Sequence, residues 1–215
     1  MAQNHYSDMP DVALKDWRKS ERARLIAARV ALDASHMSRL RVAMDAHLER
    51  AFPMLATGTV AFCWPYRNEY DARHLMHRMR ARGARTALPV VIGSKQPLIF
   101  RYWQPGDVLA KGVYDIPYPP NGEAIVPDVA LVPMNGFDTG GYRLGYGGGF
   151  FDRTLASLSA GGLTRPLAIG VTYELARMET IHPQPYDIPM DYVVTERGVY
   201  ERRASGLRLT ETGTT

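Results

Sequence analysis

The chain has 215 residues, of which 46% are hydrophobic and 22% are charged, values that are ordinary for a globular protein. A chain of this length can bury the core of one α/β domain. Its single cysteine, Cys63, excludes an internal disulfide framework and is typical of a reducing compartment. No apolar run reaches the roughly 20 residues of a membrane helix, and the polar N-terminus lacks the apolar stretch of a secretory signal. We therefore expect a cytoplasmic protein without a membrane partner.

The net charge of +4 is unevenly distributed along the chain. Residues 1–110 hold 17 Lys or Arg against 10 Asp or Glu, whereas residues 111–215 hold 9 against 12. A basic half can serve a nucleic acid or a polyanionic small molecule. The basic residues lie on predicted helices without the repeats of RNA-binding modules. We therefore interpret them as solvated helix faces and expect no nucleic acid partner.

The first hundred residues predict helices that alternate with strands. Ser7 to Pro10 is typical of a helix start. The helix would run from about Asp11 to Leu32, with one buried side (Leu14, Trp17, Leu25 and Val30) and one basic side (Lys15, Arg18, Lys19, Arg22 and Arg29). The next predicted elements are a helix from a cap at Asp33–Ser35 to about Ala51, a strand over Thr59–Trp64, a helix over Asp71–Arg82 with Gly83 at its end, and strands over Thr86–Ile92 and Leu98–Trp103.

The second half continues the same alternation. Gly106 to Pro127 is rich in Pro and Gly and predicts a loop with at most one short edge strand. The later predicted elements are a strand over Val129–Val132, a helix over Phe151–Ser159, a strand over Leu167–Val171, a short helix over Glu174–Met178 and a hairpin of Tyr192–Thr195 with Val199–Tyr200. This order predicts an α/β fold, a three-layer sandwich whose mostly parallel central sheet is flanked by helices. We expect one domain over residues 1–203 and a flexible tail over residues 204–215.

The most informative segment runs from Leu131 to Ala156. A short apolar strand breaks at Pro133, a glycine run follows (Gly145, Gly147, Gly148 and Gly149), and a helix begins after it. A strand, a glycine loop and a helix in this order present backbone N–H groups to a phosphate. Arg143 can bind phosphate oxygens, and Asp152 supplies a carboxylate of the kind that magnesium–phosphate sites include. We predict a nucleotide phosphate site with its magnesium; a tight turn without a ligand is the alternative.

Three further acidic residues are candidates. Asp187 and Asp191 lie in a Pro-rich loop near a strand end, where loop capping and function are equally good interpretations. Glu69 follows the aromatic residues Trp64 and Tyr66 and precedes Tyr70. It either begins a helix or binds the amine of a ring stacked on these aromatics.

The remaining reactive residue types have simpler interpretations. His74 and His77 lie three apart on a predicted helix and are interpreted as helix surface, because no third ligand is spaced nearby. Cys63 lies in an apolar run and is expected to be buried and inert. With no good nucleophile, the sequence favours phosphoryl transfer, in which positioning and charge neutralisation do most of the catalysis.

These residues carry a family resemblance. The run Val132-Pro133, Phe137-Asp138 and Gly141 to Arg153 resembles the signature of the 5-formyltetrahydrofolate cyclo-ligases, also called 5,10-methenyltetrahydrofolate synthetases. The basic N-terminal helix, Trp64–Pro89 and Pro183–Glu196 resemble other parts of that family, so the likeness covers nearly the whole chain. The resemblance implies ATP-dependent closure of 5-formyltetrahydrofolate to 5,10-methenyltetrahydrofolate, with release of ADP and phosphate after the formyl oxygen attacks the γ-phosphate. It implies a reduced folate, ATP and Mg²⁺ as ligands, and we expect a monomer.

The resemblance also assigns roles by position. Arg143 and Asp152 would be catalytic, and magnesium would be held by Asp152 and Asp187. The ATP-binding residues would be Lys15, Arg18, Arg143, Leu144, Gly145, Tyr146, Gly147, Gly148, Gly149, Phe150 and Phe151. The folate-binding residues would be Trp64, Glu69, Tyr146, Gly147, Gly148, Gly149 and Phe150.

The chain departs from the family pattern in the glycine loop. Many members carry a lysine there, where this chain has Gly148. Arg143, Lys15 and the metal would then neutralise more of the ATP charge. The pair Lys15 and Arg18 is also spaced more closely than is common in the family, and Tyr118 stands where the family often has Glu-Pro.

Two other functions remain open from the sequence. The first is an α/β enzyme that acts without ATP on another phosphorylated or CoA-linked small molecule, by analogy of fold. The second is a nucleic-acid-binding module that uses the basic N-terminal half, with binding that weakens steeply with salt.

Overall fold

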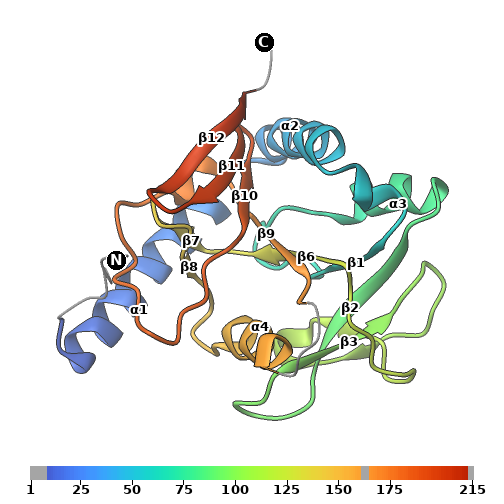
Figure 1. Cartoon of the computed structure of the whole chain (residues 1–215), viewed down its shortest axis with the longest axis horizontal. Coiled ribbons are helices and arrows are strands. Elements are labelled where there is room, and N and C mark those ends of the chain that lie inside the picture. Colours follow the sequence, from blue (N-terminus) through green and yellow to red (C-terminus); the bar gives the residue numbers. More distant parts are fainter. Residues whose placement is uncertain (1–8, 161–164, 213–215) are drawn as a thin grey trace.

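One mixed sheet forms the centre of the molecule, and helices lie on both of its faces (Figure 1). The structure, a computed structural model, describes residues 9–160 and 165–212. Within that part of the chain, the large sheet has eight strands in the order β12-β11-β10-β9-β6-β1-β2-β3. The strands from β10 to β2 in this order pair in parallel, whereas β3, β11 and β12 join antiparallel. The predicted α/β class and mostly parallel sheet are confirmed.

The helices have the following bounds. The α-helices are α1 (Asp11–Val30), α2 (Ala34–Ala51), α3 (Arg73–Ala81) and α4 (Phe150–Ala160). Three short 3₁₀ helices join them: η1 (Pro53–Ala56), η2 (Val113–Asp115) and η3 (Glu174–Ala176). None of the helices that the structure describes has an apolar stretch long enough to cross a membrane.

The strands of the large sheet are β1 (Thr59–Phe62), β2 (Arg85–Val91), β3 (Leu98–Tyr102), β6 (Val129–Pro133), β9 (Leu167–Val171), β10 (Tyr192–Thr195), β11 (Gly198–Arg203) and β12 (Gly206–Thr212). Two small antiparallel pairs lie outside it: β4 (Ala110–Lys111) with β5 (Pro117–Tyr118), and β7 (Gly136–Phe137) with β8 (Arg143–Leu144).

Alternation along the strands separates two apolar layers. Val60 and Phe62 of β1 belong to the core under α2 and α3, whereas Ala61 belongs to the core that includes Leu155 of α4. The neighbouring strands repeat the pattern, since side chains alternate between the two faces of a sheet. Figure 1 shows α2 and α3 on one side of the sheet and α4 on the other, which confirms the three-layer arrangement.

Several helix ends follow the predicted chemistry. The Asp33 side chain caps α2 by accepting the His36 N–H at 2.8 Å. Gly83, at φ +114°, ends α3 in the left-handed conformation that glycine adopts readily. At α1 the N-cap residue is Pro10, which makes no side-chain cap bond, and the predicted capping residues Ser7 and Asp8 lie outside the described residues.

The prediction of a flexible tail after Arg203 is wrong. Residues Gly206–Thr212 form β12, which pairs antiparallel with β11 across the two-residue turn Ala204-Ser205. Leu207 packs against the second core, and its N–H donates to the Thr139 carbonyl at 2.7 Å. The small polar composition concealed a hairpin in which Gly206, at φ +108°, makes the turn possible.

Candidate active site

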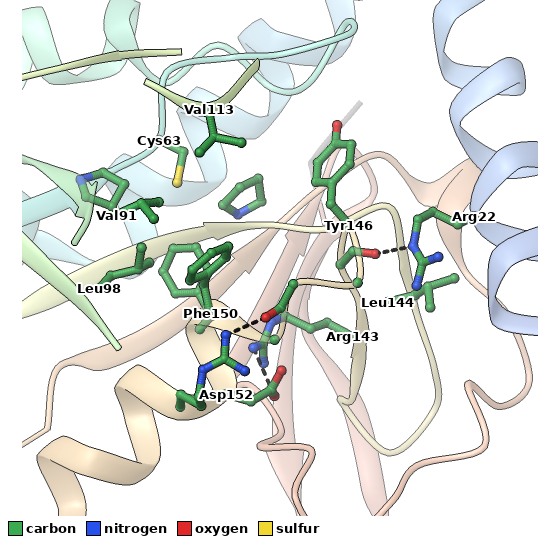
Figure 2. Close-up of a pocket in the computed structure, with 18 of the residues that line it drawn as sticks. Arg22, Cys63, Val91, Leu98, Val113, Arg143, Leu144, Tyr146, Phe150 and Asp152 are labelled. Atoms are coloured by element: carbon green, nitrogen blue, oxygen red, sulfur yellow. Dashed lines mark hydrogen bonds and ion pairs between the residues drawn. The ribbon is translucent and has the colours of Figure 1, made fainter. Parts of the chain in front are cut away.

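A large cavity opens at the carboxyl ends of β1 and β6. The chain leaves β1 through Cys63 and Trp64 and leaves β6 at Pro133, and these residues line a cavity of about 960 Å³. Figure 2 shows Cys63, Val91 and Leu98 on one side of it and Tyr146 with Arg22 on the other. Ligands of open α/β sheets bind at this edge because the loops that follow the parallel strands meet there.

The glycine segment does not follow the central strand directly, as the sequence suggested. The small β7–β8 hairpin lies between β6 and the glycine loop. Asp138 fixes this hairpin: its Oδ1 accepts the Gly140 and Tyr142 N–H groups at 2.9 and 3.0 Å, and its Oδ2 accepts the Ile181 N–H at 3.0 Å. Burial raises the pKa of Asp138, while these N–H groups oppose the shift. The hairpin thus sets the direction in which the loop enters the cavity.

Glycine is required within the loop for conformational reasons. Gly147 has φ +94° and Gly149 has φ +62°, values in the left-handed region that side chains disfavour. The loop then passes into α4, whose first turn contains Phe151 and Asp152. This geometry exposes Gly147 and Gly148 to the cavity and directs the N-terminus of α4 toward it.

The buried Arg143 and the half-buried Asp152 form an ion pair at the base of the loop. The Arg143 guanidinium lies 2.9 Å from Asp152 Oδ1 and donates to the Ile188 carbonyl at 2.8 Å. Asp152 Oδ1 also accepts the Ile188 N–H at 3.0 Å. Burial lowers the pKa of Arg143 from its usual value, and the Asp152 and Asp187 carboxylates oppose that shift. Both side chains are therefore held by their neighbours before any ligand binds.

A second ion pair joins α1 to the segment before β10. Arg18 Nη2 lies 2.6 Å from Asp187 Oδ2, and the same guanidinium donates to the Ile181 and His182 carbonyls at 3.2 and 2.8 Å. Asp187 also accepts the Gln184 N–H at 2.8 Å. Asp187 thus caps the loop, which is one of the two interpretations that the sequence left open, and it also lines the cavity.

Glu69 is buried in a hydrogen-bonded chain that crosses the cavity wall. Tyr146 donates its hydroxyl to Glu69 Oε1 at 3.0 Å, and the Tyr66 N–H donates to Oε2 at 3.0 Å. Arg29 donates to the Tyr146 hydroxyl at 2.9 Å and lies 3.8 Å from the Glu69 carboxylate. Burial raises the pKa of Glu69, and Arg29 is the main influence that lowers it. Burial also raises the pKa of Tyr146, so that its hydroxyl remains a donor.

Aromatic side chains complete the wall beside Glu69. Tyr66 stacks on Tyr114 with ring centroids 5.8 Å apart, and Tyr146 lies 5.8 Å from Tyr66. Trp64 lines the cavity and packs edge-on against Trp103 at 5.6 Å. Tyr70 is not part of this wall, because it is buried and donates its hydroxyl to Asp45.

The fold and geometry agree with comparisons to known proteins. The model of the 5-formyltetrahydrofolate cyclo-ligase family matches residues 14–196. The chain belongs to this family. A 5-formyltetrahydrofolate cyclo-ligase of Escherichia coli strain K12 is 32% identical over 155 residues, which cover 69% of this chain and 84% of the relative. One of Mycolicibacterium smegmatis is 33% identical over 157 residues, covering 67% and 77%.

Solved structures of the cyclo-ligase family share the fold. The NMR structure of Aquifex aeolicus 5,10-methenyltetrahydrofolate synthetase has a TM-score of 0.72 at 28% identity and covers 90% of this chain and 96% of its own. A 5,10-methenyltetrahydrofolate synthetase from Mycoplasma pneumoniae has a TM-score of 0.65 at 23% identity, covering 83% and 98%.

The cavity contains every residue that the family resemblance assigned to a ligand. From the N-terminal half these are Lys15, Arg18, Trp64 and Glu69, and from the second half they are Arg143–Asp152 and Asp187. Lys15 is exposed at the rim. Asp191 does not line the cavity; it pairs with Arg165 at 2.5 Å. His74 and His77 line a separate surface groove on α3. Cys63 lines the cavity rather than being fully buried, and burial raises the pKa of its thiol.

Sequence reasoning missed the roles of Arg22 and Arg29 on α1. Arg22 donates to the Gly145 carbonyl at 2.6 Å, and Arg29 is only 3% exposed, so neither lies on a solvated face as predicted. Val30, predicted to be buried, is 48% exposed. The signal was a stripe at helical spacing that mixes apolar and basic residues: Leu14, Arg18, Arg22, Leu25 and Arg29. A division by residue type alone splits this stripe into an apolar face and a basic face.

The carboxylates of Asp152 and Asp187 are the kind of ligand that suits a metal ion whose other ligands are phosphate oxygens. Asp152 and Asp187 line the same cavity as the glycine loop and flank Arg143. Within the described residues no group of three or more His, Cys, Asp or Glu side chains is placed to hold a metal ion. Mg²⁺ is commonly bound by one or two carboxylates together with substrate phosphates and water, and this pair offers that pattern.

Proposed function

We propose that this chain closes 5-formyltetrahydrofolate to 5,10-methenyltetrahydrofolate with ATP and releases ADP and phosphate. The observation that carries the proposal is that one cavity is lined by both the basic glycine loop and the Glu69–aromatic wall. A reaction between a nucleotide and a ring that carries an amine needs both walls within reach of one another. Membership of the cyclo-ligase family supports this assignment.

ATP would lie along the glycine loop and α1. Its triphosphate carries about four negative charges, which are stabilised by cations and backbone N–H groups in a site that excludes water. Arg18, Arg22 and Arg143 line this part of the cavity, and Lys15 lies at its rim. Arg18, Arg22 and Arg143 are already held by carbonyl or carboxylate partners. These side chains would therefore lose little conformational entropy when ATP binds.

The folate would lie against Trp64, Tyr66 and Glu69. The pterin ring is planar and carries an amine, so that it can stack on an aromatic side chain while its N–H groups donate to a carboxylate. Glu69 has one hydrogen bond to each oxygen and therefore retains lone pairs for a ligand.

The reaction needs the formyl group beside the γ-phosphate. The formyl oxygen attacks the γ-phosphorus, ADP leaves, and the formyl carbon becomes activated as an imidate phosphate. N10 of the folate then attacks that carbon, the carbon–oxygen bond breaks, and phosphate departs with the former formyl oxygen. Arg143 would stabilise the charge that develops on the transferred phosphoryl group. Asp152 and Asp187 would hold the magnesium, which supplies charge neutralisation at the phosphates when bound.

A spectroscopic assay tests this function. Purified protein with 5-formyltetrahydrofolate and Mg·ATP should produce the near-ultraviolet absorbance of the methenyl product, and omission of ATP should abolish it. No product with any divalent metal would contradict the proposal. Calorimetry that shows no affinity for Mg·ATP would favour instead an ATP-independent enzyme of the same fold. A cytoplasmic location and a monomeric state remain predictions.

Arg143 and Asp152 provide the first prediction about residues. Arg143→Ala and Asp152→Asn should each lower kcat by at least about 10²-fold, since removal of one donor from a preorganised anion site typically costs that much. Circular dichroism should show that both variants remain folded. Full turnover in both would exclude these residues from the chemistry.

A further inference from the structure

Arg153 is a cation of the cavity that none of the assigned roles includes. It lies in the first turn of α4, directly after Asp152. Its guanidinium folds back over the glycine loop: one Nη donates to the Gly148 carbonyl, and Cζ lies 5.3 Å from the centroid of the Phe150 ring. Its Nε is buried and has no hydrogen-bond partner. The side chain is therefore positioned by its surroundings while part of its donor capacity is unused.

The charge of Arg153 also lacks a counter-ion. In the described part of the chain no carboxylate lies within ion-pair distance of it, whereas Arg143 pairs with Asp152 and Arg18 with Asp187. An arginine that is half-buried in a cavity wall with an unmatched charge is placed to bind an anion.

The Arg153 guanidinium can lie over the loop because Gly148 and Gly149 have no side chains. A Cβ at Gly148 would lie 2.7 and 2.8 Å from atoms of the Phe150 ring, and a Cβ at Gly149 would lie 2.9 Å from Arg153 Nη1. The Phe150 ring lies against Gly148 and beneath the guanidinium, so Gly148, Phe150 and Arg153 form one interdependent unit. Figure 2 shows the Phe150 ring on the cavity wall above Asp152.

We propose that Arg153 binds the terminal phosphates of ATP and supplies a positive charge beside residue 148, where the glycine has no side chain. This inference rests on the proposed ATP-dependent function. A side chain at residue 148 would require the Phe150 ring to move, and this ring lies beneath the Arg153 guanidinium. The Arg153 guanidinium donates to the Gly148 carbonyl, so its positive charge lies beside residue 148 of the loop.

Relocating the charge tests the proposal. Arg153→Gln should raise KM for ATP, and the Kd for a non-hydrolysable ATP analogue, by about tenfold or more, the loss of roughly one charge-assisted hydrogen bond. KM for the folate should change by less than about twofold. Arg153→Lys should recover part of the ATP affinity. Gly148→Lys combined with Arg153→Ala should bind ATP more tightly than Arg153→Ala alone, because the freed Phe150 ring can move away.

Controls separate the possible failures. Arg39→Gln, on the exposed surface of α2, should leave both KM values unchanged. Gly148→Lys in the otherwise native chain should lower ATP affinity, because Arg153 holds the Phe150 ring where the new Cβ must lie. ATP binding by folded Arg153→Gln that equals the native value would overturn the inference, as would a double variant no better than Arg153→Ala. If the native protein itself neither binds Mg·ATP nor forms product, the proposed function fails first.

Discussion

At the scale of residues, the hydrogen-bonded chain from Arg29 through Tyr146 fixes the side chain of Glu69, which we propose binds the folate. Arg29 donates to the Arg67 and Met134 carbonyls at 2.9 and 3.4 Å, so one guanidinium joins α1 to the loop after β1 and to the end of β6. Because Arg29 also donates to the Tyr146 oxygen, the tyrosine proton is directed at Glu69. We infer that Arg29 is a positioning residue, which acts on the folate through Glu69.

Replacing Arg29 with methionine should therefore affect folate binding and its pH dependence. Burial raises the pKa of Glu69 and Arg29 lowers it, so loss of the guanidinium should raise that pKa further. The groups facing Glu69 are Arg29, Tyr146, the Tyr66 N–H and the Cys63 thiol. Since the amine-binding form is the carboxylate, KM for the folate should rise as pH falls, and in Arg29→Met the rise should begin at a higher pH. Initial rates between pH 5 and 8 measure this.

The controls for Arg29 use its own helix. Arg24→Met, on an exposed side chain that pairs only with Glu21 among the described residues, should reproduce neither effect. Arg29→Lys should restore part of the native profile. Removing a buried partner should also cost about 3 kcal/mol of unfolding free energy. An Arg29→Met profile that is shifted no further than that of Arg24→Met would show that Arg29 is only structural.

Residue types and order predicted most of the cavity lining but not the neighbours that fix it. Glu69 and Trp64 could be named because a carboxylate beside aromatic residues at a strand end has a chemical interpretation. Arg29 and Arg153 could not, because a single sequence does not show which arginines of a basic helix are turned inward. Arg29 is 3% exposed only because three separate segments converge on it.

At the scale of elements, helix α1 and the edge strand β12 hold the loops of the site. Leu25 of α1 forms a small apolar cluster with Leu144 and Ile181. Arg18 donates to the His182 carbonyl, next to Ile181, and Arg22 donates to the Gly145 carbonyl, next to Leu144. The β11–β12 hairpin supports the same region, because Leu207 binds the Thr139 carbonyl next to the β7–β8 turn. Both elements thus fix the direction from which the glycine loop enters the cavity.

Shortening the chain tests the role of β12. A chain that ends at Arg203 loses the β11–β12 pairing and the Leu207 contact, and its unfolding midpoint should fall by about 5 °C or more, as expected for the loss of a few kcal/mol in a protein of this size. KM for ATP should rise as well, because the β7–β8 turn loses its support. A chain that ends at Thr212 retains β12 and is the matched control. Equal stability and ATP affinity in both chains would contradict this role.

Periodicity and turn chemistry predicted the long elements well. The α2 cap at Asp33, the α3 end at Gly83 and the central strands lie where the sequence placed them. The strands β7, β8 and β12 were missed, because two-residue strands carry no periodicity and the β12 segment is rich in small polar residues. These strands are defined by their hairpin pairing and tertiary contacts rather than by the strand propensity of their residues.

At the scale of the whole molecule, the parallel centre of the sheet brings two chemistries to one edge. The ends of β1 and β6 are neighbours because these strands pair directly, although Phe62 and Leu131 are far apart in sequence. Strand β1 leads to Glu69 and the aromatic wall, and β6 leads through the β7–β8 hairpin to the glycine loop. The order of elements predicted that such an edge exists, and the strand pairing decides that the two walls face one cavity.

The transfer of oxygen tests the central claim most directly. With 5-formyltetrahydrofolate labelled with ¹⁸O in its formyl group, attack of the formyl oxygen on the γ-phosphate predicts that the label appears in the released phosphate. Mass spectrometry of that phosphate should find one ¹⁸O atom for each methenyl product formed. Label that appears in water while the phosphate remains unlabelled would contradict the account, because ATP would then not react with the folate in the shared cavity.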